Sequence, residues 1–174
     1  SDLSALPDYT EGHYYGYGGE NKGAPVDAEG KPVYYGKPDA WKIAANDGER
    51  WRWALAEAVR WSPAMALRVK RERADVLFNQ FGVQTMVQYG WSFPGRPVMD
   101  DDKVNESGTY ALHTLKHTEA LARLATGIKR FELPEEHNFV KLYSELKAHD
   151  QLGRVYLNRR QYPEAAKSFR RAGN

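Results

Sequence analysis

Cysteine is absent from the 174 residues of this chain. Its absence excludes disulfide bonds, thiolate zinc sites and a cysteine nucleophile. A chain without cysteine is compatible with both reducing and oxidising compartments, so the localisation stays open. No apolar run approaches the roughly 20 residues that a membrane-spanning helix needs, and the N-terminus carries no basic-then-apolar secretion signal. The composition, with 41% hydrophobic and 28% charged residues, is typical of a soluble globular protein without a membrane partner.

Basic and acidic residues are nearly equal in number over the whole chain, but not near the C-terminus. The net charge of +2 is too small to indicate a nucleic-acid partner by itself. From Gln151 to Asn174, however, six basic residues face a single acid, Glu164. The six are Arg154, Arg159, Arg160, Lys167, Arg170 and Arg171.

Residues 1–38 contain few aliphatic residues and are rich in Gly, Pro and Tyr. Because Gly and Pro break helices and no 3.6-residue pattern exists here, we expect an irregular arm. Residues 27–30 are expected to turn the chain before a short extended stretch at 32–35. The arm's tyrosines could pin it onto the rest of the protein, since each ring buries a large apolar area.

Residues 39–174 carry helical patterns and form the second predicted region. Ser62 and Pro63 suit the start of a helix, and Gly82 suits a left-handed helix cap. Residues 87–108, with their Pro, Gly and acidic residues, are expected to form a long loop. The predicted helices span about 41–59, 63–81, 109–127, 134–146, 148–159 and 163–173. The predicted fold class is therefore all-α.

The last two predicted helices carry a spaced motif of small and aromatic residues. Its members are Leu152, Gly153, Tyr156, Tyr162, Ala165, Phe169 and Ala172. This spacing resembles a tetratricopeptide repeat, in which small residues let two helices approach and aromatic residues fill the space beside them. No second copy aligns at the family's period of about 34 residues. The resemblance implies an irregular α-solenoid or helical-hairpin bundle, with its last repeat at about 148–174. Because no following helix covers Ala172, we expect the chain to be a fragment of a larger protein.

Four further stretches resemble a helical region of very large bacterial alpha-2-macroglobulin-like proteins. They are DGERWRWALAEA (47–58), FGVQTM (81–86), GTYALHTLKHTEALARLATGIKRFELPEEHNF (108–139) and NRRQYPEAAKSFRRA (158–172). The resemblance implies an extracytoplasmic protein of the periplasm or envelope. Thioester chemistry in that family needs Cys and Gln, so no reactive residue carries over to this chain. The implied role is structural.

Three residue groups could carry chemistry, and each also has a packing or solvation explanation. His113 and His117 would share one face of a helix at a spacing that suits a metal pair, but no third ligand or HExxH base accompanies them. The acidic run 100–102 lacks the Gly and Glu of a calcium loop. Most of the five tryptophans fit a helix core, and Trp53 lies off the predicted buried face.

The sequence thus favours a non-catalytic helical-repeat scaffold or protein–protein interaction module that needs no metal or cofactor. Its expected partner is a protein or peptide segment, or a neighbouring domain of the same polypeptide. Two alternatives stay open: a metal-binding or hydrolytic protein using His113 and His117, and binding of an anionic ligand or nucleic acid through the C-terminal arginines, with nucleic acid the less favoured. The predicted partner-binding residues are Arg154, Asn158, Arg159, Arg160, Arg170 and Trp53.

Overall fold

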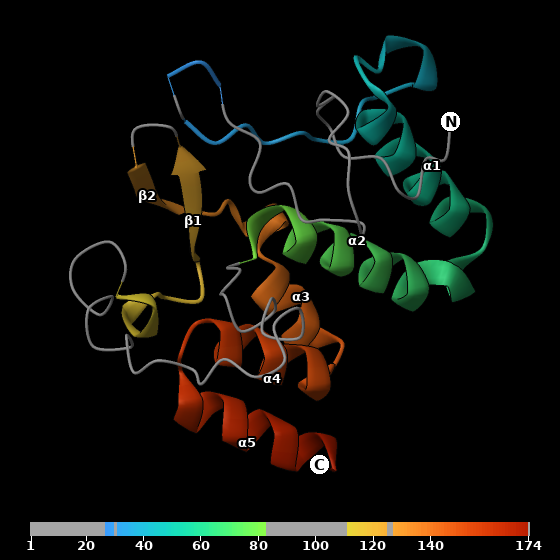
Figure 1. Cartoon of the computed structure of the whole chain (residues 1–174). Coiled ribbons are helices and arrows are strands. Elements are labelled where there is room, and N and C mark those ends of the chain that lie inside the picture. Colours follow the sequence, from blue (N-terminus) through green and yellow to red (C-terminus); the bar gives the residue numbers. More distant parts are fainter. Residues whose placement is uncertain (1–26, 30, 83–110, 125–126, 174) are drawn as a thin grey trace, which may run out of the picture.

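The computed structural model describes residues 27–29, 31–82, 111–124 and 127–173, and in these ranges the chain is mostly helical (Figure 1). The helices are α1 (Asp47–Trp61), α2 (Ala66–Phe81), α3 (Phe139–Glu145), α4 (His149–Asn158) and α5 (Tyr162–Ala172). Two strands, β1 (Glu119–Leu124) and β2 (Gly127–Glu132), form an antiparallel sheet. The described residues therefore agree with a broadly all-α fold that also contains one small hairpin. The predicted loop at 87–108 lies outside these ranges.

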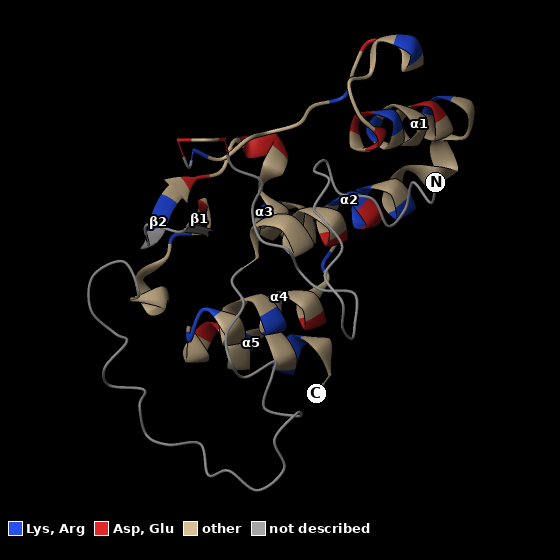
Figure 2. Ribbon diagram, turned by 45° about the horizontal axis from the view of Figure 1, so that its top comes forward, with Lys and Arg blue, Asp and Glu red and all other residues tan. Residues whose placement is uncertain are grey.

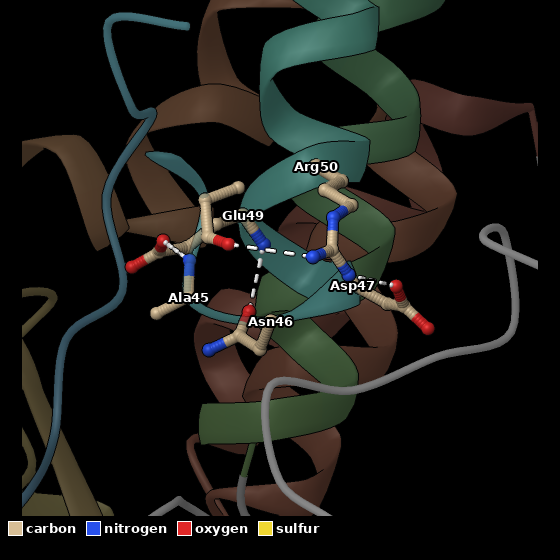
Figure 3. Close-up of polar contacts among 6 residues, drawn as sticks. Ala45, Asn46, Asp47, Glu49 and Arg50 are labelled. Carbon is tan, nitrogen blue, oxygen red and sulfur yellow. Dashed lines mark hydrogen bonds and ion pairs between the residues drawn. The ribbon is translucent and has the colours of Figure 1, made fainter. Parts of the chain in front are cut away.

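Helix α1 begins at a network of side-chain caps (Figure 3). Oδ1 of the N-cap residue Asn46 accepts a hydrogen bond from the Glu49 N–H at 2.9 Å. The Glu49 carboxylate in turn accepts from the Ala45 N–H at 2.7 Å. The Asn46 side chain thus satisfies one of the amide groups that the first turn of a helix leaves free, and the Glu49 carboxylate holds the residue before the cap. The cap explains why α1 begins at Asp47, later than the apolar pattern from Trp41 predicts.

Pro63 lies at the start of the helical segment, as predicted, but Ser62 makes no side-chain cap, and Gly82 also differs from its prediction. Pro63 opens a 3₁₀ turn, Pro63–Met65, that leads directly into α2. Gly82 was expected to adopt a left-handed conformation, yet its φ of −67° and ψ of 143° are extended. A Cβ at Gly82 would overlap the backbone oxygen and ring of Phe78. Close approach of the backbone, rather than a positive φ, therefore requires glycine here.

The prediction of a helix over 109–127 is wrong. Leu112–Thr114 is a single 3₁₀ turn, and residues 119–132 form the β1–β2 hairpin with Glu119 opposite Glu132. Ala and Leu favour a helix locally, but tertiary contacts override such preferences. Ala120 is completely buried in the core, and Phe131 packs edge-on against Phe81 at 6.2 Å between ring centroids.

The hydrophobic core lies between α2, the hairpin and the C-terminal helices, and α1 contributes none of its residues. Helix α2 packs on α3, α3 on α4, and α4 on α5. Tyr143 of α3 donates a 2.7 Å hydrogen bond to the Asp75 carboxylate of α2. The buried core residues are Ala74, Leu77, Phe81, Ala120, Leu133, Phe139, Val140, Tyr143, Ala148, Leu152, Val155, Tyr156 and Ala165.

Helices α4 and α5 form the αα-hairpin that the motif predicts. A Cβ built on Gly153 would lie 2.5 Å from Cε1 of Phe169, so only glycine allows this approach. Ala165 is buried at the same interface with 3% exposure. Pro163 lies in the first turn of α5, and Gly173 caps the helix with a φ of 89°.

The described part of the arm is extended and anchored to the helical body. Oδ1 of Asp27 accepts hydrogen bonds from the N–H groups of Glu29 and Lys31, which makes the predicted turn. The Tyr34 hydroxyl donates to the Glu132 carbonyl oxygen at 2.7 Å, and its ring lies 5.7 Å from that of Phe81. The prediction that a tyrosine pins the arm is therefore confirmed for Tyr34.

Candidate functional site

Arg159 is not an exposed partner contact, and this prediction is wrong. Its side chain is completely buried and donates hydrogen bonds to the backbone oxygens of Lys116 at 2.7 Å and Glu119 at 2.9 Å. The guanidinium also lies 5.6 Å from the centre of the Phe139 ring. Burial lowers the pKa of Arg159 to about 10, so the group remains protonated at pH 7. Arg159 therefore holds the segment before β1 in place.

Neighbouring residues hold the same segment from the α4–α5 connection. The Gln161 amide donates to the backbone oxygens of His113 at 3.2 Å and Leu115 at 2.7 Å. The Tyr156 hydroxyl lies 3.4 Å from Nε2 of His117. Asn158, another predicted contact, is only 7% exposed. Arg159 thus contacts the chain's own segment before β1, and both Arg159 and Asn158 are buried, so neither side chain is exposed to a partner.

The other predicted contacts are more exposed than these two residues. Arg154 is exposed and pairs with Asp150 at 3.3 Å within α4. Arg160 is half-buried, with a left-handed φ of 56°. Arg170 is exposed on α5. Trp53 is half-buried on α1, where its ring packs edge-on against Trp41 at 5.9 Å. The six residues do not form one surface.

Helix α5 has a basic exposed face, and its Lys and Arg residues are blue along the ribbon in Figure 2. Ala165 and Ser168 point into the hairpin, whereas Lys167, Arg170 and Arg171 are exposed. Among the described residues, none of these three cations has an ion-pair partner. The face can therefore attract an anionic group without first breaking an internal pair.

The two histidines of the predicted metal pair do not lie on a helix. His113 belongs to the 3₁₀ turn and His117 to the turn before β1, so the one-face spacing no longer applies. Within the described ranges, no group of three His, Asp or Glu side chains could hold a metal ion. The acidic run 100–102 lies outside those ranges.

A pocket of about 460 Å³ opens between α1, α2 and the segment 35–37. Its apolar walls come from α1 and α2, and Glu136 and His137 of the 3₁₀ turn Glu135–His137 also line it. Three cations also line it, one from each of the elements that form its sides. They are Lys37, Arg52 and Arg73. Sequence reasoning missed this site, because the lining segments are far apart in the chain.

His137 is the most constrained polar group of the pocket. It is 4% exposed, and Nε2 lies 3.1 Å from the Tyr35 carbonyl oxygen. Nε2 must carry the proton and donate, since a carbonyl can only accept. In the neutral ring Nδ1 is then an acceptor, and it has no hydrogen-bond partner among the described residues; the Glu136 carboxylate lies 3.6 Å away. Burial lowers the pKa of His137, opposed by the Tyr35 hydrogen bond and by Glu136.

None of the helices in the described ranges is long and apolar enough to cross a membrane. Neither the tetratricopeptide-like spacing nor the macroglobulin-like stretches gain support from known proteins. Comparison with protein-family models, curated proteins and solved structures finds no match for this chain.

Proposed function

We propose that the chain is a non-catalytic helical module of tetratricopeptide-like type that binds an acidic protein segment across the outer face of α5. The exposed cations of that face carry the proposal. Lys167, Arg170 and Arg171 are exposed beside one another on a short helix and have no ion-pair partner among the described residues. Exposed charges that are not neutralised internally steer and hold an oppositely charged partner.

The packing beneath this face supports a binding role. Gly153 and Phe169 fix the distance between α4 and α5, and Arg159 ties the end of α4 to the segment before β1. The cations therefore stand on a rigid hairpin. A preorganised surface loses little conformational entropy when a partner binds.

The exposed apolar residues of the hairpin make a polypeptide the favoured partner. Tyr162 is 56% exposed and Leu157 is 40% exposed, at the start of α5 and near the end of α4. An acidic polypeptide can pair with the cations and also cover apolar side chains, as partners of mixed chemistry do at protein interfaces. The phosphate backbone of a nucleic acid would pair with the cations but would leave these apolar side chains uncovered.

A fluorescein-labelled decaglutamate peptide tests the proposal by fluorescence anisotropy. We expect saturable binding that weakens as salt increases, because exposed charges are screened over about 10 Å at 0.1 M salt. The variant Lys167→Glu/Arg171→Glu should abolish this binding. The control Lys42→Glu/Arg68→Glu changes the net charge equally at exposed sites on other elements.

Equal loss of binding in the two double variants would show that only overall charge matters, and would refute the proposed surface. Binding that survives in both would refute it as well. An oligothymidylate of the same length serves as competitor. If it binds more tightly than the peptide at the same salt concentration, phosphate recognition replaces the proposed function.

A further inference from the structure

The turn between α1 and α2 exposes large apolar side chains. Trp61, the last residue of α1, is 78% exposed, and Leu67, in the first turn of α2, is 70% exposed. In both Figure 1 and Figure 2 this turn lies at the right-hand edge of the molecule. Residues 61–67 therefore form an apolar tip at the surface. The residues between its two large side chains carry no charge, and most of them are exposed as well; they are Ser62, Pro63, Ala64, Met65 and Ala66.

The backbone of the tip is largely hydrogen-bonded within itself. The Ser62 N–H donates to the Ala58 oxygen and the Met65 N–H to the Ser62 oxygen, each at 2.9 Å. The Ala66 N–H donates to the Pro63 oxygen, and Pro63 has no N–H of its own. Unpaired backbone groups make it costly to move a segment from water into lipid. The hydrogen bonds of the tip lower that cost.

The segment that carries the tip is basic. Residues 58–71 contain four basic residues and no acidic one. Two of the four, Arg60 and Lys70, are paired with glutamates. The other two, Arg68 and Arg71, are exposed and form no ion pair with a described residue. Cations that can pair with an external anion thus stand beside the exposed apolar side chains.

A lipid surface fits this combination better than a second protein does. A stable protein–protein interface takes about 20–30 residues from each partner, far more than the tip offers. A second copy of the chain would also bring its own cations against these, because a two-fold interface joins the same patch of both subunits. A bilayer needs only a few inserted side chains. Tryptophan is enriched at the level of the headgroups, and nearby cations are attracted to anionic lipids.

We infer that the α1–α2 turn docks the protein on the surface of an anionic lipid bilayer. Trp61 and Leu67 enter the boundary between headgroups and acyl chains, and Arg68 and Arg71 pair with lipid phosphates. Docking of this kind needs no membrane-spanning run, and it differs from the expectation, drawn from composition, of no membrane partner. The tip and the basic face of α5 lie on different elements, so the two proposals stand or fall independently.

Co-sedimentation with sucrose-loaded vesicles tests the inference on the full chain. Vesicles of phosphatidylglycerol and phosphatidylcholine in equal amounts should bind the protein. Vesicles of phosphatidylcholine alone should bind it at least about tenfold more weakly, because each of the two cations contributes about fivefold near an anionic surface. Equal binding to both kinds of vesicle, or binding to neither, would overturn the inference.

A matched pair of aliphatic variants locates the inserted side chains. Leu67→Ala should weaken binding to the anionic vesicles at least about fivefold, since it removes apolar area that lipid would cover. Ile43→Ala is the control, because Ile43 is 66% exposed on another element and should not touch the bilayer. Equal losses in the two variants would overturn the inference. So would a dimer in sedimentation velocity that Leu67→Ala converts to a monomer, because the tip would then bind a second copy of the chain.

A matched pair of charge variants locates the lipid phosphates. Arg68→Gln/Arg71→Gln should weaken binding at least about tenfold. Lys116→Gln/Lys129→Gln makes the same change in net charge at exposed sites before and within the β1–β2 hairpin, and it should weaken binding much less. Equal losses here would mean that only overall charge attracts the protein to the vesicles, and the inference would fail.

Quenching of tryptophan fluorescence by brominated lipid is an independent test of insertion. Bromine atoms on the acyl chains quench only an indole that reaches them, so the fluorescence of the wild type should fall on binding. Trp61→Phe keeps a ring that can insert but removes this indole. Its binding should persist, and the quenching of its remaining tryptophans should be much smaller. Equal quenching in the wild type and Trp61→Phe would place another surface on the bilayer and overturn the inference.

Discussion

Replacing Arg159 by methionine removes a buried cation that links two parts of the chain. Methionine retains much of the side-chain length and can still pack on Phe139. It cannot donate to the backbone oxygens of Lys116 and Glu119, which Arg159 contacts at 2.7 and 2.9 Å. The change therefore tests the hydrogen bonds rather than the packing.

The expected cost follows from these two bonds. A hydrogen bond to a charged group contributes about 1.5–3 kcal/mol, so the two give a gross loss of roughly 3–6 kcal/mol. Methionine recovers part of this, because a guanidinium no longer has to be desolvated. The Lys116 oxygen also keeps a second donor, the Glu119 N–H at 3.1 Å. We expect a net destabilisation of about 2–4 kcal/mol, or a fall in Tm of roughly 6–12 °C for a chain of this size.

Urea unfolding followed by circular dichroism measures this loss. Arg154→Met is the matched control, because Arg154 lies on the same helix but its side chain is 63% exposed, and we expect it to change stability by less than about 0.5 kcal/mol. Arg159→Lys keeps the charge but not the two-pronged geometry, so its cost should lie between the two. Equal stability of Arg159→Met and the wild type would refute the reasoning.

Three further changes test separate contacts by the same unfolding assay. Tyr143→Phe should cost about 1.5–3 kcal/mol, because the buried hydroxyl donates to the Asp75 carboxylate at 2.7 Å; Asp75→Asn keeps an acceptor and should cost less, and the reverse order would contradict this assignment. Gly153→Ala should destabilise by about 1–3 kcal/mol despite alanine's better helix propensity, since its Cβ would meet the Phe169 ring; a stabilised variant would show that the ring moves freely, and adding Phe169→Leu should recover part of the loss. Burial lowers the pKa of His137, so below the unfolded-state pKa of about 6.5 the unfolded chain binds a proton that the folded chain resists; folding stability should therefore fall between pH 7 and 5.5 by up to about 1 kcal/mol more than in His137→Gln, and parallel pH profiles for the two proteins would contradict it.

The helices that the sequence predicted well are those with local start and stop residues. Pro63 and Pro163 lie where a helix tolerates proline. Between such residues, the 3.6-residue pattern predicts a helix without any information on contacts with distant parts of the chain. The close approach at Gly153 was also predicted locally, because the repeat spacing itself places a small residue opposite an aromatic one.

The hairpin at 119–132 could not be predicted in this way. Its sequence is rich in Ala and Leu, and these residues form an apolar stripe on a helix as readily as they fit a hairpin. What decides the structure is distant in the chain: Arg159 and Gln161 bind backbone oxygens of residues 113–119, some 40 residues earlier. A helix would use most of these oxygens internally, so the two arrangements exclude each other.

The pocket was hidden for a related reason. Trp51, Leu55 and Val59 of α1 line the pocket together, but an amphipathic pattern says only that a helix face is apolar. Whether another element fills it depends on how closely the helix approaches its neighbours. Here α1 shares no residue with the core cluster, so part of its face lines a cavity.

The two kinds of arginine near the C-terminus should respond differently to salt, and this difference separates stability from binding. Arg159 is completely buried, so counterions screen its contacts little. Arg170 and Arg171 are exposed in the last turn of α5, where a cation also interacts favourably with the helix C-terminus. Raising salt should therefore weaken binding of an acidic peptide while leaving the stability difference between wild type and Arg159→Met nearly unchanged. Since the sequence motif alone treats both kinds as helix-surface residues, it is burial, not position in the repeat, that separates a structural arginine from a binding one.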